Sequence, residues 1–243
     1  MGRILTGPGT GARLAPPRIP EDACTTMNGE PPSPAQLAAI GDPFVRKLAS
    51  LGRVRSYPRS TVIITEGDSS DSVFVVLSGK VKAFVSDSEG HELILDTQGP
   101  GDYVGEMALD GKPRSASVVT LESTTFSVVQ REPLRDAIRK DPDFALDMIS
   151  KVIERARDAT DNVKNLALLD VYGRVARLLL NMAVEAEDGK LRIPEKITQQ
   201  EIAERVGASR DMVSRIFRDL TIGGYISVEN RIVTINKKPP AKW

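Results

Sequence analysis

The stretch that decides the fold of this chain is residues 197–220, which read ITQQEIAERVGASRDMVSRIFRDL. Thr198 stands three residues before Glu201, the spacing of a capping box, so the sequence predicts a helix that starts there. Gly207 tolerates the left-handed backbone of a tight turn, and Ser209 can cap a further helix. The stretch therefore predicts a helix, a short turn and a second helix.

The two predicted helices separate apolar from polar side chains. The inward side chains are expected to be Ile202, Ala203, Val206, Met212, Val213, Ile216 and Leu220. The outward side chains of the second helix are Arg210, Asp211, Ser214, Arg215 and Arg218. Arg can hold guanine O6 and N7, Asp can accept from cytosine N4, and Ser or Arg can bind phosphates. This face fits a DNA major groove; the alternative is an ordinary helical pair with solvated arginines.

A hairpin is predicted after the second helix. Residues 225–228 and 231–235 alternate apolar and polar side chains around Glu229 and Asn230, the arrangement of a wing. Together with the helix-turn-helix, it indicates a winged DNA-binding domain.

A long helix is expected upstream, followed by a second helix over 171–184. Apolar residues recur at steps of three and four, as in the seam of a coiled coil: Ile149, Val152, Ala156, Ala159, Val163 and Leu166. Such a narrow seam favours a parallel homodimer. The alternative is a helix packed on its own β-domain.

Residues 54–130 form a β-rich region. Short strands are predicted at 60–65, 72–77, 80–86, 92–96, 115–121 and 124–129, separated by turns that contain Gly, Asp or Ser. This spacing is typical of an antiparallel sandwich or jelly roll. A helical lead-in is expected over 36–51.

One segment of the β-region has the composition of an anion site. Residues 101–109 read GDYVGEMAL, and residues 113–116 read PRSA. A Gly followed by a helical turn offers free backbone N–H groups. Arg114 and Ser115 can bind a phosphate, and Glu106 can accept from ribose hydroxyls. The alternative is a structural ion pair between Arg114 and Glu106.

Composition excludes several classes of protein. Cys24 and His91 are the only Cys and His among 243 residues, so a disulfide framework, a metal cage and a His-based triad are all disfavoured. No apolar run is long enough to span a membrane, and the N-terminus lacks a secretory signal. We expect a cytoplasmic protein with no metal and no tightly bound cofactor.

Charge is unevenly distributed along the chain. The whole sequence holds 33 basic and 33 acidic residues, but residues 164–243 hold 14 and 10, a net +4, and the remainder is net −4. Residues 1–35 carry 7 Pro and 5 Gly and are expected to form a disordered leader. Translation could start at Met1 or at Met27.

These motifs resemble those of the cyclic-AMP receptor protein/FNR superfamily of bacterial transcription regulators. The resemblance spans about residues 54–235. Its most specific parts are GEMAL at 105–109 with RSA at 114–116, NLALLDV at 165–171, and ITQQEI at 197–202 with VGASR at 206–210.

The resemblance implies an α+β architecture: an antiparallel, jelly-roll-like β-roll that binds a cyclic nucleotide (36–140), a dimerisation helix (141–169) and a winged helix-turn-helix (170–243). It implies a transcription regulator, and no enzyme, that works as a homodimer with operator DNA and RNA polymerase. Activation is expected, and repression is the alternative. The expected ligand-binding residues are Gly105, Glu106, Met107, Ala108, Arg114, Ser115, Ala116, Asp96 and Thr160. The expected DNA-binding residues are Thr198, Gln199, Ser209, Arg210, Asp211, Ser214, Arg215 and Arg218.

Three departures from the family pattern leave the ligand and the operator open. Asp211 replaces the Glu of the usual base reader, so the operator cannot be copied. Ala159-Thr160 replaces the Thr-Ser of cyclic-AMP-specific members, and Asp96, which suits guanine N1–H and N2–H₂ better than adenine, replaces a Ser. Cyclic AMP is expected from the family, with cyclic GMP, cyclic di-GMP and a ligand-independent regulator as alternatives. With only Cys24, the iron–sulfur branch is excluded.

Overall fold

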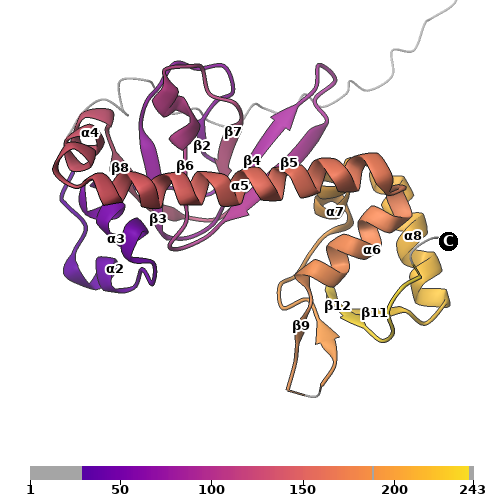
Figure 1. Cartoon of the computed structure of the whole chain (residues 1–243). Coiled ribbons are helices and arrows are strands. Elements are labelled where there is room, and N and C mark those ends of the chain that lie inside the picture. The colour runs from indigo at the N-terminus through magenta and orange to yellow at the C-terminus, as the bar shows by residue number, and fades with distance from the viewer. Residues whose placement is uncertain (1–28, 188, 241–243) are drawn as a thin grey trace, which may run out of the picture.

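The structure is a computed structural model that describes residues 29–187 and 189–240. Most of the predicted leader, 1–35, lies outside these residues, together with Cys24 and Met27. What is described combines antiparallel sheets, one very long helix and a smaller helical part with its own sheet, as Figure 1 shows. The predicted α+β class is confirmed.

Two short helices stand where the sequence predicted one over 36–51. They are α2 (Pro34–Ala38), which begins inside the predicted leader, and α3 (Pro43–Ser50). The single-helix prediction was wrong because Pro43 disfavours helical backbone in the residue before it. That residue, Asp42, instead caps α3 by accepting from the backbone N–H groups of the next turn.

Two four-stranded antiparallel sheets form the β-roll, with strand orders β1-β8-β3-β6 and β2-β7-β4-β5. Their bounds are β1 Arg53–Tyr57, β2 Val62–Ile64, β3 Val73–Ser78, β4 Val81–Ser86, β5 Glu92–Gln98, β6 Tyr103–Val104, β7 Ser117–Thr120 and β8 Thr124–Val129. All six predicted strands are present. The sequence did not predict β1, whose RVRSY is largely polar, or β6, which has only two residues.

The core of the β-roll lies between the two sheets. Phe74 and Phe126 are almost fully buried there and meet edge to face, with ring centroids 5.7 Å apart. A second cluster lies beneath α3 and the helices that follow the roll, and it includes Phe44, Tyr103 and Phe144. Tyr103 therefore belongs to the packing that joins the roll to its helices.

The roll ends in α4 (Arg131–Lys140), and α5 (Pro142–Leu168) then crosses the whole molecule (Figure 1). Asp141 has extended backbone between them because Pro142 follows it. The predicted seam faces solvent in this single chain: Ile149, Val152 and Val163 are 53%, 45% and 64% exposed. Side chains this apolar and this exposed form an uncovered stripe.

The C-terminal part begins after α5. Its helices are α6 (Val171–Met182), α7 (Gln199–Val206) and α8 (Arg210–Ile222). Its sheet has the order β11-β12-β10-β9, with bounds β9 Val184–Glu185, β10 Leu191–Arg192, β11 Ile226–Glu229 and β12 Ile232–Ile235. The predicted wing is β11-β12. The sequence did not predict β9 and β10, and the helix predicted over 171–184 ends at residue 182.

Two details of the C-terminal core differ from expectation. Met212 was expected to face inward but is 42% exposed, whereas Phe217 is buried with Val213, Ile216 and Leu220. The buried stripe of α8 thus starts one residue later than predicted and includes Phe217 in place of Met212.

Candidate functional site

The cassette that the sequence singled out follows β6. Gly105 has φ +92°, and a Cβ there would lie 2.7 Å from Arg114 Nη1 and 2.8 Å from the Ser72 carbonyl oxygen. Only glycine fits this position, because the backbone is left-handed and the space is taken. A 3₁₀ turn over Glu106–Asp110 follows, which confirms the helical turn expected there.

Arg114 lies inside the roll, only 5% exposed. Nη1 donates to the Gly105 carbonyl (2.6 Å), and Nη2 donates to the Ser72 carbonyl (2.7 Å) and Ser70 Oγ (2.8 Å). These acceptors belong to one cassette residue, Gly105, and to Ser70 and Ser72 outside the cassette. Glu106, the other member of the ion pair considered as an alternative, contacts Arg155. A phosphate that reached the Arg114 guanidinium would be a stronger acceptor than these neutral oxygens.

Glu106 pairs instead with Arg155 on α5. Arg155 Nη1 lies 2.7 Å from Glu106 Oε1, and Nη2 donates to the Tyr103 carbonyl at 2.6 Å. The same guanidinium stacks on the Tyr103 ring, 4.2 Å from its centroid. Because the Glu106 side chain is only 10% exposed, this pair is held in a partly desolvated setting that ties the cassette to the long helix.

Electrostatics around Arg155 agree with this geometry. Burial by itself would lower the pKa of Arg155, but the charge and hydrogen bond of Glu106 outweigh it and raise the pKa. The charge of Asp96 on β5 also favours the cation. Burial raises the pKa of Tyr103, whose hydroxyl has no hydrogen-bond partner among the described residues.

The other predicted ligand residues lie at the surface of the cassette or away from it. Ser115 is exposed and its hydroxyl lies 3.3 Å from the sulfur of Met107, which is 65% exposed. Asp96 is exposed on β5 and accepts from the Thr97 N–H and the Gln98 side-chain amide. Ala116 is half-buried, and the side chain of Ala108 lies outside what the structure describes.

Thr160 is not brought to the cassette by any contact in the described part of the chain. Its hydroxyl donates to the Ala156 carbonyl of its own helix, and the residue is exposed on α5. Thr160 lies five positions after Arg155, so the two side chains are about 140° apart around the helix axis. Within one chain, Thr160 and Arg155 therefore face different directions.

Two residues of this site were missed by the sequence reasoning. Arg155 was not among the predicted site residues, and Tyr103 was included only as part of the run GDYVGEMAL at 101–109. No spacing in the sequence signals that a residue of α5 reaches back to Glu106. Metal binding has no candidate: no three His, Cys, Asp or Glu side chains gather suitably in residues 29–187 and 189–240.

The second candidate site is the face of the helix-turn-helix. Thr198 Oγ1 accepts from the Glu201 N–H (3.1 Å), Gly207 is left-handed at φ +61°, and Ser209 Oγ accepts from the Met212 N–H (3.2 Å). The predicted caps and turn are thus present. The predicted return bond of the capping box is not recorded; the Glu201 carboxylate accepts from Arg205 instead.

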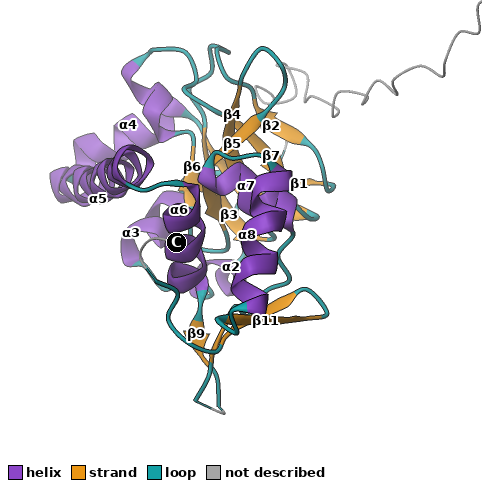
Figure 2. Ribbon diagram, turned by 90° about the vertical axis from the view of Figure 1, so that its right-hand side faces the viewer, coloured by secondary structure: helices purple, strands orange, loops and turns teal. Residues whose placement is uncertain are grey.

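The predicted DNA-binding residues lie at or near the surface, with Gln199 half-buried and the other seven exposed. A groove of about 670 Å³ between α7, α8 and the wing is lined in part by Thr198, Gln199, Arg210, Ser214, Arg218 and Arg231. Asp211 and Arg215 lie outside this groove on the exposed side of α8. Figure 2 places α8 and β11 side by side at the edge of the molecule.

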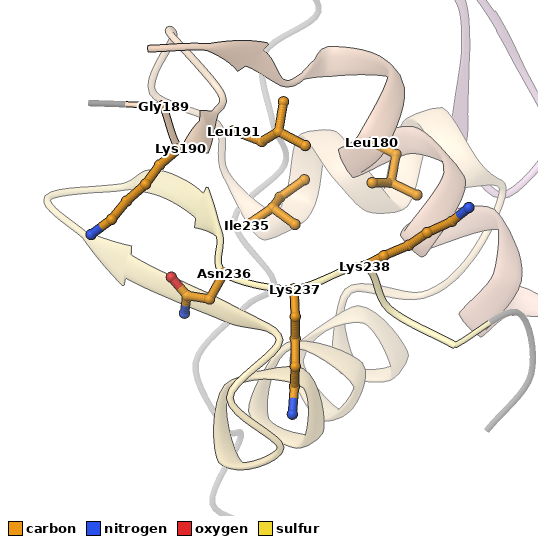
Figure 3. Close-up of a pocket in the computed structure, with 8 residues that line it drawn as sticks. All are labelled: Leu180, Gly189, Lys190, Leu191, Ile235, Asn236, Lys237 and Lys238. Carbon is orange, nitrogen blue, oxygen red and sulfur yellow. The ribbon is translucent and has the colours of Figure 1, made fainter. Parts of the chain in front are cut away.

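A basic pocket of about 410 Å³ lies elsewhere in the same part (Figure 3). Leu180, Leu191 and Ile235 supply its apolar side chains, and Lys190, Lys237 and Lys238 supply its charge. It shares no lining residue with the groove. Positive charge is therefore spread over more than one side of the C-terminal part.

Comparisons with known proteins match both sites. Residues 54–141 match the model of the cyclic nucleotide-binding domain, and residues 173–239 match that of the Crp-like helix-turn-helix domain. None of the helices in the described residues has the length and apolarity needed to cross a membrane.

Two relatives are similar over most of the chain. The CRP-like cAMP-activated global transcriptional regulator of Mycobacterium tuberculosis is 34% identical, over 74% of this chain and 82% of its own length. The cAMP-activated global transcriptional regulator CRP of Salmonella typhimurium is 31% identical, over 80% and 94%. Among solved structures, the c-di-GMP responsive regulator CLP of Xanthomonas campestris has a TM-score of 0.70, with 80% of this chain and 98% of that one covered, at 24% identity.

Proposed function

Because the chain belongs to the CRP/FNR family of transcription regulators, we propose that it is a homodimer whose affinity for operator DNA is set by a cyclic nucleotide. One observation carries the proposal: a glycine-bounded cassette with Glu106 and Arg114 occurs in the same chain as an exposed recognition helix. In this scheme residues 36–140 sense the nucleotide, 141–169 dimerise and 170–243 bind DNA.

Cyclic AMP is the ligand we propose. Both relatives are described as cAMP-activated, and the cassette offers the groups that a 3′,5′-cyclic monophosphate needs. Arg114 and Ser115 would bind the phosphate, and Glu106, with the backbone from Gly105 to Ala108, would bind the ribose. Glu106 can accept from a ribose hydroxyl while it keeps its contact with Arg155, because a carboxylate has two oxygens.

A guanine nucleotide is the second candidate, and Asp96 favours it. Its carboxylate is exposed on β5 and can accept from guanine N1–H and N2–H₂, whereas adenine would present an acceptor there. Ala159 also lacks the hydroxyl that cyclic-AMP-specific members carry next to Thr160. The CLP structure comes from a protein described as c-di-GMP responsive. At 24% identity, its similarity to this chain supports a shared fold and not a shared ligand.

Dimerisation through α5 is the next part of the proposal. The exposed seam would be covered by the same seam of a second chain, as in a parallel coiled coil. Two recognition helices would then meet successive major grooves about 34 Å apart on a near-palindromic site. We also propose that the protein binds RNA polymerase, activates transcription and is located in the cytoplasm. These three statements rest on membership of the family alone.

Titration calorimetry with cyclic AMP, cyclic GMP and cyclic di-GMP tests the sensor. We expect one of them to bind wild-type protein and to bind Arg114→Ala at least tenfold more weakly, because a buried charge-assisted contact to phosphate is lost. Absence of binding to all three would refute the sensor assignment. Normal binding to Arg114→Ala would refute the phosphate site.

DNA binding is tested by measuring operator affinity at a stated salt concentration with and without the nucleotide that binds. An increase in affinity on adding nucleotide is expected. Operator affinity that does not change would instead identify a ligand-independent regulator with the same fold.

A further inference from the structure

The first helix of the helix-turn-helix rests on the β-roll. Helix α7 contacts β5, and in Figure 1 it lies directly beneath the end of α5. A Cβ at Gly207 would lie 3.6 Å from Leu93 Cδ1 of β5 and 3.8 Å from Leu166 Cδ2 of α5. The turn between α7 and α8 thus meets the sensing sheet and the long helix at one point.

An ion-pair network crosses this contact. Lys82 on β4 pairs with Glu92 on β5 and, at 3.3 Å, with Glu204 on α7. The side chains of Lys82 and Glu204 are only 14% and 18% exposed, so water screens the pair less than it screens an ordinary surface pair. The Lys82 stem also passes Phe84, with Nζ 5.1 Å from the ring centroid.

A second polar contact between α7 and the β-roll is made by the next residue of α7. Arg205 Nη2 donates to Thr97 Oγ1 of β5 at 2.8 Å, and the same nitrogen donates to Glu201 at 3.0 Å. Glu201 therefore orients the guanidinium toward the sheet. Neighbouring residues of α7, Glu204 and Arg205, thus reach two neighbouring strands of the β-roll.

Strand β5 connects this contact to the candidate nucleotide site. Asp96 and Thr97 are adjacent, so their side chains leave opposite faces of the strand. The charge of Asp96 favours the cationic form of Arg155, which pairs with Glu106 of the cassette, whereas Thr97 accepts from Arg205 of α7. Asp96 also accepts from the Thr97 N–H at 2.7 Å. A shift of β5 toward a ligand on one face would therefore change the contact between Thr97 and Arg205, and with it the position of α7, on the other face.

We infer that Lys82 and Arg205 are positioning residues that hold α7, and with it the recognition helix, in a set orientation relative to the nucleotide pocket. The inference rests on the proposed function and deepens it by naming the contact through which the two sites communicate. Coupling between two sites requires contacts whose free energy differs between two states of the molecule. These contacts and the packing of Gly207 join α7 to the sensing part, and Lys80 of the β-roll pairs with Glu195, which precedes α7.

Amide hydrogen exchange of the full chain tests the contact without any ligand. The variants are Lys82→Gln, Glu204→Gln, their double variant and Thr97→Val, with Lys82→Arg as the conservative replacement. Lys47→Gln is the matched control, because it breaks a pair between α3 and Asp141, which precedes α5, and touches neither β5 nor α7. We expect exchange in β5 and α7 to be about three- to tenfold faster in both single Gln variants, with no further increase in the double variant.

Thr97→Val should show the same change to a smaller extent, Lys82→Arg should restore wild-type exchange, and Lys47→Gln should leave β5 and α7 unchanged. Exchange that does not change in the Gln variants would overturn the inference, as would effects of Lys82→Gln and Glu204→Gln that simply add. The additive result would mean that the two side chains act independently.

Operator affinity with and without cyclic AMP tests the role in coupling. The ratio of the two affinities should fall several-fold in Lys82→Gln and Glu204→Gln, while the nucleotide still binds the cassette. A ratio that stays at the wild-type value despite faster exchange would overturn the coupling role. If wild-type protein bound no nucleotide, the proposed function would fail, and hydrogen exchange would still decide whether Lys82 holds α7.

Discussion

Arg155 connects the cassette to the long helix through a single guanidinium. Arg155→Ala would leave the Glu106 carboxylate, 10% exposed, without its cation. We expect the free energy of unfolding to fall by about 1–2 kcal/mol, less than for a fully buried pair because Arg155 is 32% exposed, and nucleotide affinity to fall with it. Urea unfolding and calorimetry measure the two effects.

Arg155→Lys provides the first comparison, because it restores charge but not the second donor that reaches the Tyr103 carbonyl. Arg155→Lys should recover part of the unfolding free energy and part of the nucleotide affinity that Arg155→Ala loses. Arg157→Ala, at an exposed position of the same helix, is the control and should change neither quantity. Wild-type stability in Arg155→Ala would contradict the role assigned to this pair.

Arg210 begins the recognition helix, where the N-terminal residues of such helices meet base edges. Arg210→Ala should lose about 1–3 kcal/mol of discrimination between operator and random DNA, because a bidentate guanine contact is removed. Competition shift assays at one salt concentration measure it. Arg139→Ala, on α4 of the sensing half, is the control; equal discrimination by Arg210→Ala and the wild type would refute the assignment.

Single residues also show how far the sequence predicts the site. Glu106 and Arg114 could be chosen because the cassette motif is local, and Gly105 explains why that motif needs a glycine. Arg155 could not be chosen, because its contact with Glu106 spans 49 positions and depends on how α5 lies across the roll.

Among the elements, α5 has an apolar seam that its own chain leaves uncovered. Val163→Asp places a charge in that seam, and because Val163 is 64% exposed the single chain should still fold. We expect dissociation to monomers at micromolar concentration, measured by sedimentation velocity. Lys164→Asp, beside the seam, should remain dimeric; a dimeric Val163→Asp would contradict dimerisation through this stripe.

Arg174 on α6 secures the end of α7. Nε donates to the Val206 carbonyl (2.8 Å) and Nη1 to the Leu169 carbonyl (3.0 Å), so one side chain binds both the helix-turn-helix and the end of the long helix. Arg174→Ala should lower the stability of the C-terminal part by about 1–3 kcal/mol, measured by urea unfolding. Arg177 is exposed on the same helix, and Arg177→Ala should change the stability of the C-terminal part little. Equal losses of stability in Arg174→Ala and Arg177→Ala would contradict the role of Arg174.

Element boundaries were predicted where local chemistry sets them. Gly207 and Ser209 fixed the turn and the start of α8, since backbone conformation and capping depend on neighbouring residues alone. The two-residue strands β6, β9 and β10 could not be predicted, because β6 and β10 form by pairing with distant strands and β9 forms by pairing with β10. The choice between Met212 and Phe217 also depended on tertiary packing.

For the whole molecule, the uneven charge predicts two different salt responses. The C-terminal part should bind DNA with an affinity that falls steeply with salt, with a slope of about −0.9 per phosphate neutralised. Nucleotide binding at the cassette should change far less, because the Arg114 side chain is buried. Calorimetry and fluorescence anisotropy over one range of salt concentrations measure both; equal salt dependence would contradict the separation of the two sites.

The overall architecture was predictable because a β-roll, a seam-bearing helix and a winged helix-turn-helix each have a local pattern. Their mutual arrangement was not. Nothing in the sequence around Lys82 indicates that its ammonium group meets Glu204, 122 positions away. Contacts between parts depend on the sum of many weak surface interactions, which leave no periodic signal.

The unbroken length of α5 has a mechanical consequence. Its 27 residues form a rod about 40 Å long at 1.5 Å per residue. Arg155, which ties α5 to the cassette, lies 13 residues, or about 20 Å, from the end at Leu168. A tilt of about 10° about that point would displace the end by about 3.5 Å, close to the 3.4 Å rise between neighbouring base pairs. A movement too small to disturb the sensing core could thus put the recognition helix out of register by a whole base pair.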